Sequence, residues 1–455
     1  MLENQKRQNI EALSTDKLLK LAETNPEGLR TTLIGMRGSE LGYVLLNCEK
    51  DRQRQLLFRH IPDELRGDAL LELPETLQED LLASLYPHEI ETVVEHLDSD
   101  DAADILQSVD KAVAAVVIDQ LEPEERREIE PLLEHDEESA GGLMQAELFK
   151  VREDWLADKV LSVLRRWGGD IEKLNYVYVV NNDDQLRGVL ALQELLFCEP
   201  ETSIMEIANA EFPKVYAGQD QEEVVRTFKE YDVLALPVVN EENILIGRIT
   251  ADDILDVVQE EATEDMYRLA ALSEHDDLAE SVGTTAWRRS IWLAVNMGTA
   301  ILASLVIAQF EQTIAQLVAL AILMPVVASM GGIAGTQTLT IIVRGIALNR
   351  ITFENAKRAI IKEVIVGSIT GLSFAIAMGV IASFWFEEIG AKLGLVIGLA
   401  MAINLLVAGF AGTLIPLTMR RMHIDPALAS GTILTTVTDV VGFFTFLGLA
   451  TVFLL

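Results

Sequence analysis

The residue with the clearest chemical consequence in this sequence is a single aspartate within a long apolar stretch. Asp439 is the only acidic residue among residues 427–455. A helix of that length crosses a bilayer with some tilt, and an ionised Asp at its centre costs roughly 2.5–3.5 kcal/mol on insertion scales. We therefore expect Asp439 to face a water-filled path or an ion, with an interhelical hydrogen bond as the alternative.

A second group of carboxylates lies in the segment from Asp252 to Glu280, which precedes the first apolar stretch and has a helical pattern. Seven of its acidic residues fall within its first 14 positions: Asp252, Asp253, Asp256, Glu260, Glu261, Glu264 and Asp265. On a helix they form two stripes of like charge, which weaken an isolated helix by a few tenths of a kcal/mol per pair. A solvated face is the ordinary explanation. Bound divalent cations would also relieve the repulsion, since hard oxygen ligands suit magnesium, calcium or manganese.

These carboxylates belong to a chain with two different halves, the first strongly acidic and the second hydrophobic. Residues 1–286 carry a formal charge of −38 and residues 287–455 a charge of +3, within a chain of 455 residues and −35 overall. Such acidity argues against nucleic acid as a partner, because phosphates attract Lys and Arg, and it favours cations. Simple solubility is the alternative explanation for an acidic surface.

The hydrophobic half contains five apolar segments, the second of them interrupted by Pro325 and Gly331-Gly332. They cover about residues 290–309, 314–344, 364–386, 393–419 and 427–455. Basic loops alternate with acidic ones between them. The bias of Lys and Arg predicts a multi-pass protein of the cell (inner) membrane with a cytosolic N-terminus and an external C-terminus. A homodimer around a twofold axis would bring two copies of Asp439 together, with a cation between them.

The acidic half contains two internal repeats. Within residues 61–133 an aliphatic residue recurs every 12 positions and is followed by Pro or Asp, with short amphipathic helical patterns between. The recurring residues are Ile61, Leu73, Leu85, Leu97, Val109 and Leu121. Pro and Asp are common at helix starts, so the pattern predicts a stack of helical hairpins of either hand. Its expected role is that of an interaction or spacer domain.

The second repeat has a period of 59 residues. YVVNNDDQLRGVLALQELL (178–196) aligns with PVVNEENILIGRITADDIL (237–255), each predicted as strand, turn, strand and helix. These units resemble tandem CBS domains, which often hold adenine nucleotides. The family's ribose-contacting pattern matches Thr250 and Asp253, whereas the first unit has Ala191 and Glu194, so the resemblance implies at most one nucleotide per chain. Tyr176 is a further candidate for that site.

The whole order of parts resembles one family of membrane proteins. The second apolar segment contains MPVVASMGGIAGTQTLTIIVRGIAL (324–348), and the last contains TTVTD ending at Asp439. With the helical repeat, the CBS pair and five spans, these resemble the MgtE family of magnesium channels. This chain departs from the family at Ile333 and Thr336, where Asn is common, which affects the expected ion preference.

The resemblance implies roles for several residues. Asp439 matches the pore carboxylate that holds hydrated magnesium. The implied cytosolic magnesium-sensing carboxylates are Asp220, Glu222, Asp232, Asp253, Asp256, Glu261, Glu264, Asp265 and Asp425. Candidates to line the pore are Gly331, Gly332, Gly335, Thr435, Thr436, Thr438 and Asn404, although Gly331 and Gly335 also form a helix-packing GxxxG pair. The alternative for the three threonines is a hydrogen bond back to their own helix. Asn404 is the weaker candidate, and a packing contact is the favoured explanation for it.

The sequence therefore predicts a multidomain protein with an all-α helical-repeat domain, α/β tandem CBS domains and an α-helical membrane domain of five transmembrane helices. The expected boundaries are 1–138, 139–199 and 200–258 for the soluble domains, 259–286 for the acidic connecting helix and 287–455 for the pore domain. The expected function is a magnesium channel that is shut by magnesium on the cytosolic side. The alternative is a proton- or sodium-coupled carrier; an enzyme is not expected, because no nucleophile–base set is found.

Overall fold

The computed structural model of this chain describes residues 15–167, 173–270, 272, 281–348, 350–386 and 389–455. The chain forms two units, Met1–Glu261 and Ala262–Leu455, which are described separately below. Helix α16 (Ala251–Leu269) begins in the first unit and ends in the second. Of the predicted connecting helix 259–286, residues 271 and 273–280 lie outside the described residues.

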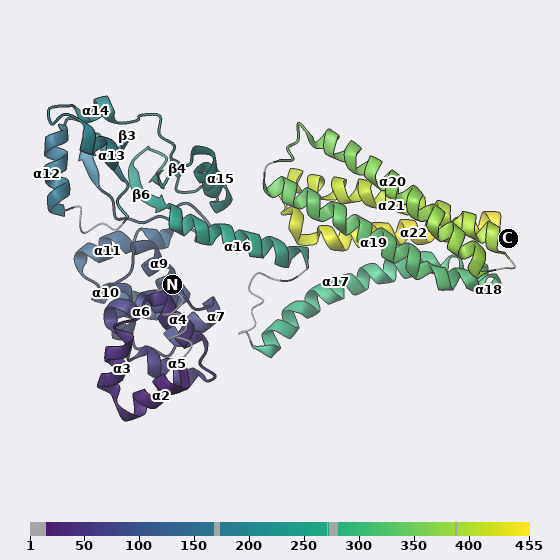
Figure 1. The fold of residues 1–455 in the computed structure, drawn as a ribbon, viewed down its shortest axis with the longest axis horizontal. Coiled ribbons are helices and arrows are strands. Elements are labelled where there is room, and N and C mark those ends of the chain that lie inside the picture. The colour runs from purple at the N-terminus through teal and green to yellow at the C-terminus, as the bar shows by residue number, and fades with distance from the viewer. Residues whose placement is uncertain (1–14, 168–172, 271, 273–280, 349, 387–388) are drawn as a thin grey trace, which may run out of the picture. The chain divides into compact units, whose positions relative to one another are not determined.

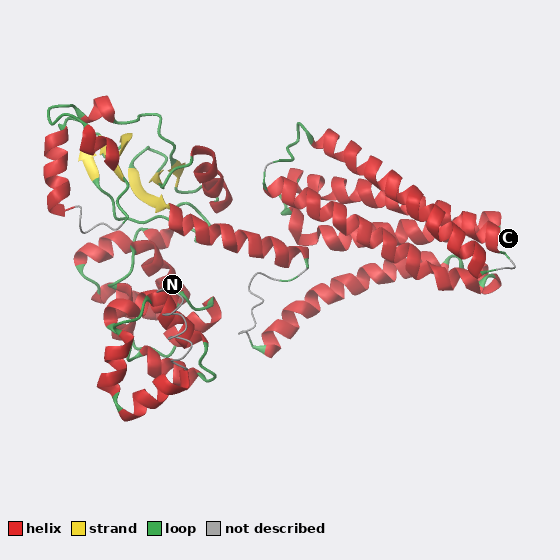
Figure 2. Ribbon diagram, viewed as in Figure 1, coloured by secondary structure: helices red, strands yellow, loops and turns green. Residues whose placement is uncertain are grey.

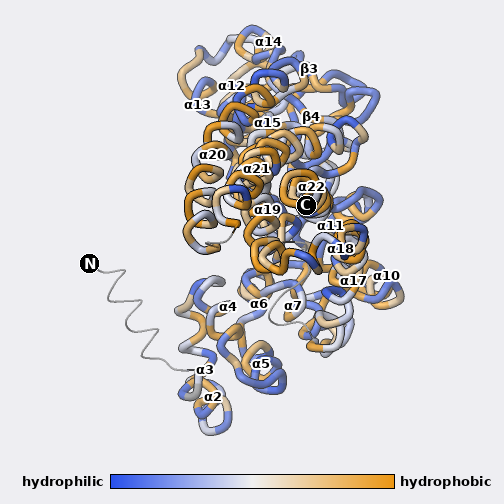
Figure 3. The backbone as a smooth tube through the Cα atoms, turned by 90° about the vertical axis from the view of Figure 1, so that its right-hand side faces the viewer, coloured by the Kyte–Doolittle hydropathy of each residue, from blue (hydrophilic) through white to orange (hydrophobic). Residues whose placement is uncertain are grey.

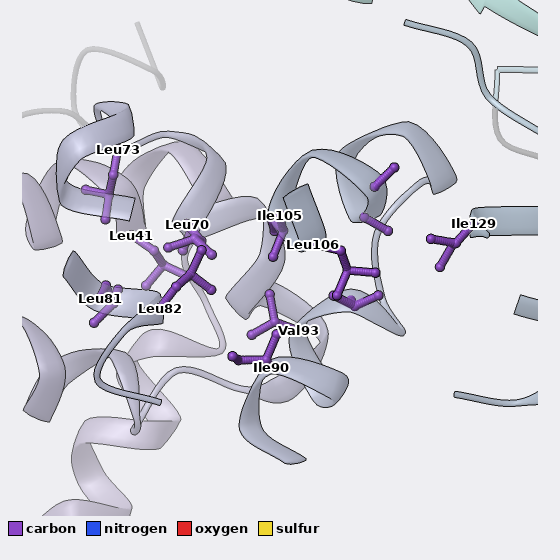
Figure 4. Close-up of a cluster of buried hydrophobic side chains, with 14 of the residues drawn as sticks. Leu41, Leu70, Leu73, Leu81, Leu82, Ile90, Val93, Ile105, Leu106 and Ile129 are labelled. Carbon is purple, nitrogen blue, oxygen red and sulfur yellow. The ribbon is translucent and has the colours of Figure 1, made fainter. Parts of the chain in front are cut away.

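The predicted helical repeat is confirmed as a series of short helices. They are α2 (Thr15–Thr24), α3 (Pro26–Leu33), α4 (Gly38–Leu46), α5 (Asp51–Phe58), α6 (Asp63–Leu71), α7 (Glu75–Leu82), α8 (Pro87–Val94), α9 (Ser99–Ser108), α10 (Lys111–Gln120) and α11 (Pro123–Ile129). Each recurring aliphatic residue comes just before a helix, and Asp110 caps α10 through the amide of Ala112. Leu41, Leu70 and Leu82 gather in the shared core (Figure 4).

Two small sheets follow, joined to the helical stack by the 3₁₀ turn Leu132–Glu134. The first sheet has β1 (Lys150–Arg152), β2 (Tyr176–Val180) and β3 (Leu186–Ala191), with helices α12 (Ala157–Trp167) and α13 (Leu192–Phe197). The second has β4 (Val215–Tyr216), β5 (Ala235–Val239) and β6 (Leu245–Thr250), with α14 (Ile204–Ile207), α15 (Gln221–Tyr231) and α16. In each sheet the first pair of strands is parallel and the second pair antiparallel. Figure 2 shows strands of this part of the chain in yellow among its red helices.

The 59-residue repeat is confirmed in detail. Both antiparallel pairs shift register at equivalent positions, after Val179 and after Val238. Both hairpin turns contain a residue with positive φ, Asp184 and Asn243, a conformation that Asp and Asn tolerate better than most residues. The two turns also pair with each other, since the amide of Leu245 donates to the carbonyl of Asp184. The two 59-residue repeats are thus equivalent halves of one paired module.

The second unit contains five helices that are long and apolar enough to cross a membrane. They are α17 (Val282–Ala308), α19 (Val318–Ala347), α20 (Ala356–Trp385), α21 (Gly390–Arg421) and α22 (Pro426–Phe453), with the short α18 (Glu311–Gln316) between the first two. Helix α21 packs against α19, α20 and α22 (Figure 1). Hydrophobic residues run along these helices (Figure 3).

The expected interruption of the second apolar segment is absent from the described residues. Helix α19 stays helical from Val318 to Ala347 with Pro325 inside it. A break would expose unpaired backbone N–H and C=O groups to the bilayer core, where no water compensates them, whereas a proline removes only one N–H. The continuous helix therefore presents side chains, rather than free carbonyls, along its length.

Candidate functional site

A cavity of about 540 Å³, open on one side, lies between α19 and α22. Its lining residues are Ala328, Ser329, Gly332, Ile333, Thr336, Gln337, Thr435 and Asp439. Asp439 follows the first residue of the 28-residue helix α22 by 13 positions, which puts it midway along the apolar span. The cavity thus holds a carboxylate at the depth expected for the middle of a bilayer.

The carboxylate of Asp439 is half-buried and has no protein hydrogen bond within the described part of the chain. This argues against the alternative of an interhelical hydrogen bond, which would need a donor on a neighbouring helix. Thr435 lies one turn earlier on the same wall, and its hydroxyl donates to the carbonyl of Gly431. The carboxylate is therefore available to water or to an ion in the cavity.

Some of the other candidate pore-lining residues face the cavity, and the rest lie in the helix packing behind it. Gly332 and Thr435 line it, whereas Thr436 and Thr438 donate back to carbonyls of their own helix. The remaining candidates, Gly331, Gly335 and Asn404, are buried in helix contacts behind the wall.

Two polar cavity residues, Ser329 and Gln337, escaped the sequence-based selection. With Gly332, Ile333 and Thr336 they recur at i, i+3, i+4, i+7 and i+8, which is one face of a helix. That spacing was visible in the sequence, but it did not reveal which face of an apolar helix borders the cavity. Ile333 and Thr336, the departures from the family pattern, both lie on this wall.

At the cytosol-facing end expected for the second unit, the last turn of α16 contacts the start of α22. The guanidinium of Arg268 donates from Nη1 to Oδ2 of Asp425 at 2.8 Å and pairs with Glu264. Asp425 is the N-cap of α22, and its Oδ1 accepts from the amide of Ala427. Leu269 packs on Leu339, Val343, Ala411, Ala427 and Leu434. The end of α16 is thus fixed to the helix that carries Asp439.

In the first unit, two carboxylates of α9, Asp100 and Asp101, lie near Asp253 at the start of α16. Asp100 is 7% exposed, and its buried Oδ1 has no hydrogen-bond partner in the described part of the chain. Burial, followed by the charges of Asp101 and Asp253, raises the pKa of Asp100 well above its ordinary value. Burial and Asp253 raise the pKa of Asp101 to about 7. Uncompensated carboxylates of this kind are suited to bind a cation.

Asp104 lies one turn further along α9, and burial together with Asp101 also raises its pKa. Its side chain nevertheless reaches the surface, so we expect water to moderate that shift. These three aspartates were missed in the sequence. The run SDDAADIL is acid-rich, but nothing in it indicates the approach of Asp253 from far along the chain.

The cluster predicts a specific pH dependence. Because the folded state raises these pKa values, the protein holds protons there that the unfolded chain releases, and stability falls as pH rises from about 4 through about 7. Magnesium requires the ionised form, so its binding to the cluster should weaken as pH falls below about 7. Hydrogen exchange of the α9 amides in the full-length protein, with and without magnesium at pH 6 and 8, measures this. Equal magnesium protection at both pH values would contradict it.

Three of the remaining predicted sensing carboxylates have local structural roles, and Asp265 is half-buried on α16. Asp220 caps α15, Asp232 ends that helix with φ 52°, and Glu261 accepts a hydrogen bond of 2.6 Å from Gln221. Glu222 and Asp256 are exposed. No three His, Cys, Asp or Glu side chains among the described residues form a preassembled metal site. A regulatory ion would therefore have to draw its ligands together.

The nucleotide-binding candidates lie close together. The hydroxyl of Thr250 donates to Oδ2 of Asp253 at 2.6 Å. The hydroxyl oxygen of Tyr176 accepts from the amide of Leu234, and the carbonyl of Leu234 accepts from the amide of Ala251. Lys173 pairs with Asp252 beside them and adds a positive charge. The second repeat therefore supplies a hydroxyl and a carboxylate, and β2 of the first sheet supplies an aromatic ring, the kinds of group that a nucleoside would need.

Three family models match parts of this chain. The MgtE divalent cation transporter model matches residues 324–449, the model of the MgtE intracellular N domain matches 43–138, and the CBS domain model matches 202–260. These ranges include the Asp439 cavity, Asp100 and Asp253.

Two relatives bear the name magnesium transporter MgtE. The one from Thermus thermophilus is 36% identical, over 77% of this chain and 78% of the relative. The one from Bacillus subtilis is 30% identical, over 89% of each. A crystal structure of the cytosolic domain of the Mg²⁺ channel MgtE in complex with ATP is 36% identical, covers 54% of this chain and 99% of that one, and has a TM-score of 0.50.

Proposed function

This chain belongs to the MgtE family of magnesium transporters, and on that basis we propose that it is a channel that passes Mg²⁺ into the cytosol through the Asp439 cavity. The observation that carries the proposal is a half-buried carboxylate, free of protein donors among the described residues, facing a cavity midway along an apolar helix. Membrane insertion and divalent cations as cargo follow from the family itself.

The cavity suits an ion that keeps its water. Magnesium loses its hydration shell reluctantly and binds through one or two carboxylates plus water. The groups beside Asp439 are hydroxyls, an amide and apolar side chains rather than further carboxylates. A membrane potential of 100 mV, negative inside, favours a divalent cation by ~4.6 kcal/mol, twice the single-charge value of ~2.3. Inward flow therefore needs no other energy source.

A homodimer would complete the pathway. The cavity is open on one side, and α17 has almost no buried side chains along its apolar length. A second copy related by a twofold axis would cover such surfaces and supply a second Asp439. We place the N-terminus in the cytosol and the C-terminus outside, because the basic loops between the spans would then lie in the cytosol.

We assign gating to the acidic half. At low internal magnesium, Asp100, Asp101 and Asp253 repel one another, which disfavours close packing of α9 against the start of α16. Magnesium between them would hold the start of α16 in place. The opposite end of that helix is tied to α22 by Arg268 and Asp425. An ion bound at the cluster could thus act on the pore helix and close it.

An adenine nucleotide is a second proposed ligand. The related cytosolic domain was crystallised with ATP, and Thr250, Asp253 and Tyr176 form one group here. Since Asp253 also belongs to the acidic cluster, nucleotide and magnesium binding would be energetically linked.

The deciding experiment measures magnesium uptake by the purified protein in liposomes at a clamped membrane potential. We expect uptake to increase with an inside-negative potential and to persist when a protonophore removes the proton gradient or when sodium is absent. Uptake that stops under either condition at unchanged voltage would instead identify a proton- or sodium-coupled carrier.

A further inference from the structure

Asn404 is a buried amide at the point where three membrane helices meet. It lies on α21 with 1% of its surface exposed. Its Nδ2 donates to the carbonyl of Val327 on α19 at 3.0 Å. That carbonyl precedes Ala328, the first cavity-lining residue of α19. The amide therefore holds α19 from the side opposite the cavity.

Two glycines accommodate this amide. A Cβ at Gly331 on α19 would collide with Nδ2 of Asn404, and one at Gly442 on α22 would lie 2.7 Å from the same atom. Gly331 precedes the cavity residue Gly332, and Gly442 follows Asp439 by three positions, less than one helical turn. One side chain therefore touches the backs of both cavity walls.

The amide is not fully satisfied by these contacts. Its Oδ1 is buried and has no hydrogen-bond partner among the residues that the structure describes. A buried acceptor of this kind is costly, and an apolar side chain could fill the same space without that cost. A role confined to packing therefore explains the site poorly, whereas a directional bond that fixes the position of α19 requires the N–H donor.

We propose that Asn404 is a positioning residue that sets the separation of the α19 and α22 walls, and thereby discriminates among hydrated divalent cations in the Asp439 cavity. This inference rests on the proposed function of that cavity. It differs from a lining role, because Asn404 does not reach the cavity and acts through Val327, Gly331 and Gly442.

The test compares uptake of Mg²⁺, Mn²⁺, Co²⁺ and Ca²⁺ by reconstituted Asn404→Leu and Asn404→Ala proteins. Leu fills the space without a donor, and Ala leaves it empty. We expect both to change the ratio of Mg²⁺ to Ca²⁺ uptake by at least about fivefold, equivalent to ~1 kcal/mol between the two ions. The control is Thr413→Val on the same helix. Thr413 is fully buried, but its hydroxyl bonds only within α21, to Gly409.

A double-mutant cycle adds a readout that general loss of stability would not produce. Gly442→Ala alone should change the ratio, because its new methyl group displaces the amide, whereas adding it to Asn404→Ala should change little more. Asn404→Ser, with a shorter donor, serves if the Ala protein does not fold. If the ratio of Mg²⁺ to Ca²⁺ uptake is unaltered in these variants while uptake still depends on Asp439, the inference about Asn404 is wrong and the proposed function stands. Uptake that does not depend on Asp439 would instead refute the proposed function.

Discussion

Asp439→Asn will lower magnesium uptake by reconstituted protein by at least about a hundredfold, the effect of ~2.7 kcal/mol on a barrier. The carboxylate faces the cavity without a protein donor among the described residues. A unit charge pair at 4 Å is worth ~4 kcal/mol at an effective dielectric of about 20. The amide is nearly isosteric but carries no charge, so it cannot replace this attraction. Initial uptake rates at fixed voltage measure the effect.

The matched control for Asp439 is Glu311→Gln, which also neutralises one carboxylate of the second unit. Glu311 is exposed at the start of α18 and does not line the cavity. Its uptake should stay within about twofold of the original protein, since an exposed distant charge is screened by salt. Near-normal uptake by correctly inserted Asp439→Asn protein would rule out Asp439 as the pore carboxylate.

Asp100→Asn will raise the internal magnesium concentration needed to close the channel by at least about tenfold, which corresponds to ~1.4 kcal/mol of binding energy. Asp100 is the most buried carboxylate of the cluster and has an unpartnered oxygen. The same substitution should stabilise the first unit against unfolding in the absence of magnesium, because the folded state disfavours the ionised form of Asp100 and Asn carries no charge. Loss of a merely structural group would lower stability instead.

Both effects can be measured on the full-length protein, as uptake against internal magnesium and as protease resistance of the soluble half. Asp119→Asn is the matched control in the neighbouring helix α10, because Asp119 is exposed and forms only a surface pair with Arg126. If Asp100→Asn closes at the original magnesium concentration, the cluster does not sense magnesium.

Several structural features could be read from the sequence because they depend on local pattern. The 12-residue repeat identified the helix starts, since Pro and Asp suit the first turn of a helix. The 59-residue repeat identified two matching sheets, because alternating apolar residues and Asn-rich turns specify a hairpin. The apolar segments located five long helices to within a few residues at most ends.

The membrane helices show where local pattern stops being informative. Helix α19 is apolar on all sides, so its composition does not distinguish the face toward the cavity from the face toward α21. Ser329 and Gln337 were therefore missed. A packing contact was the favoured explanation for Asn404, but the sequence did not show which helices it contacts. The expected break at Pro325 did not occur, because pairing of the backbone in a bilayer outweighs local helix propensity.

The order of the domains, the five spans and the single carboxylate midway along the last span can all be read from the amino-acid sequence. The folded structure is needed to see which side chains share the Asp439 cavity, that Asp100 and Asp101 lie near Asp253, and that Arg268 pairs with Asp425. Helix propensity and hydropathy act over a few neighbouring residues, whereas charge clusters and cavities depend on distant segments that packing brings together.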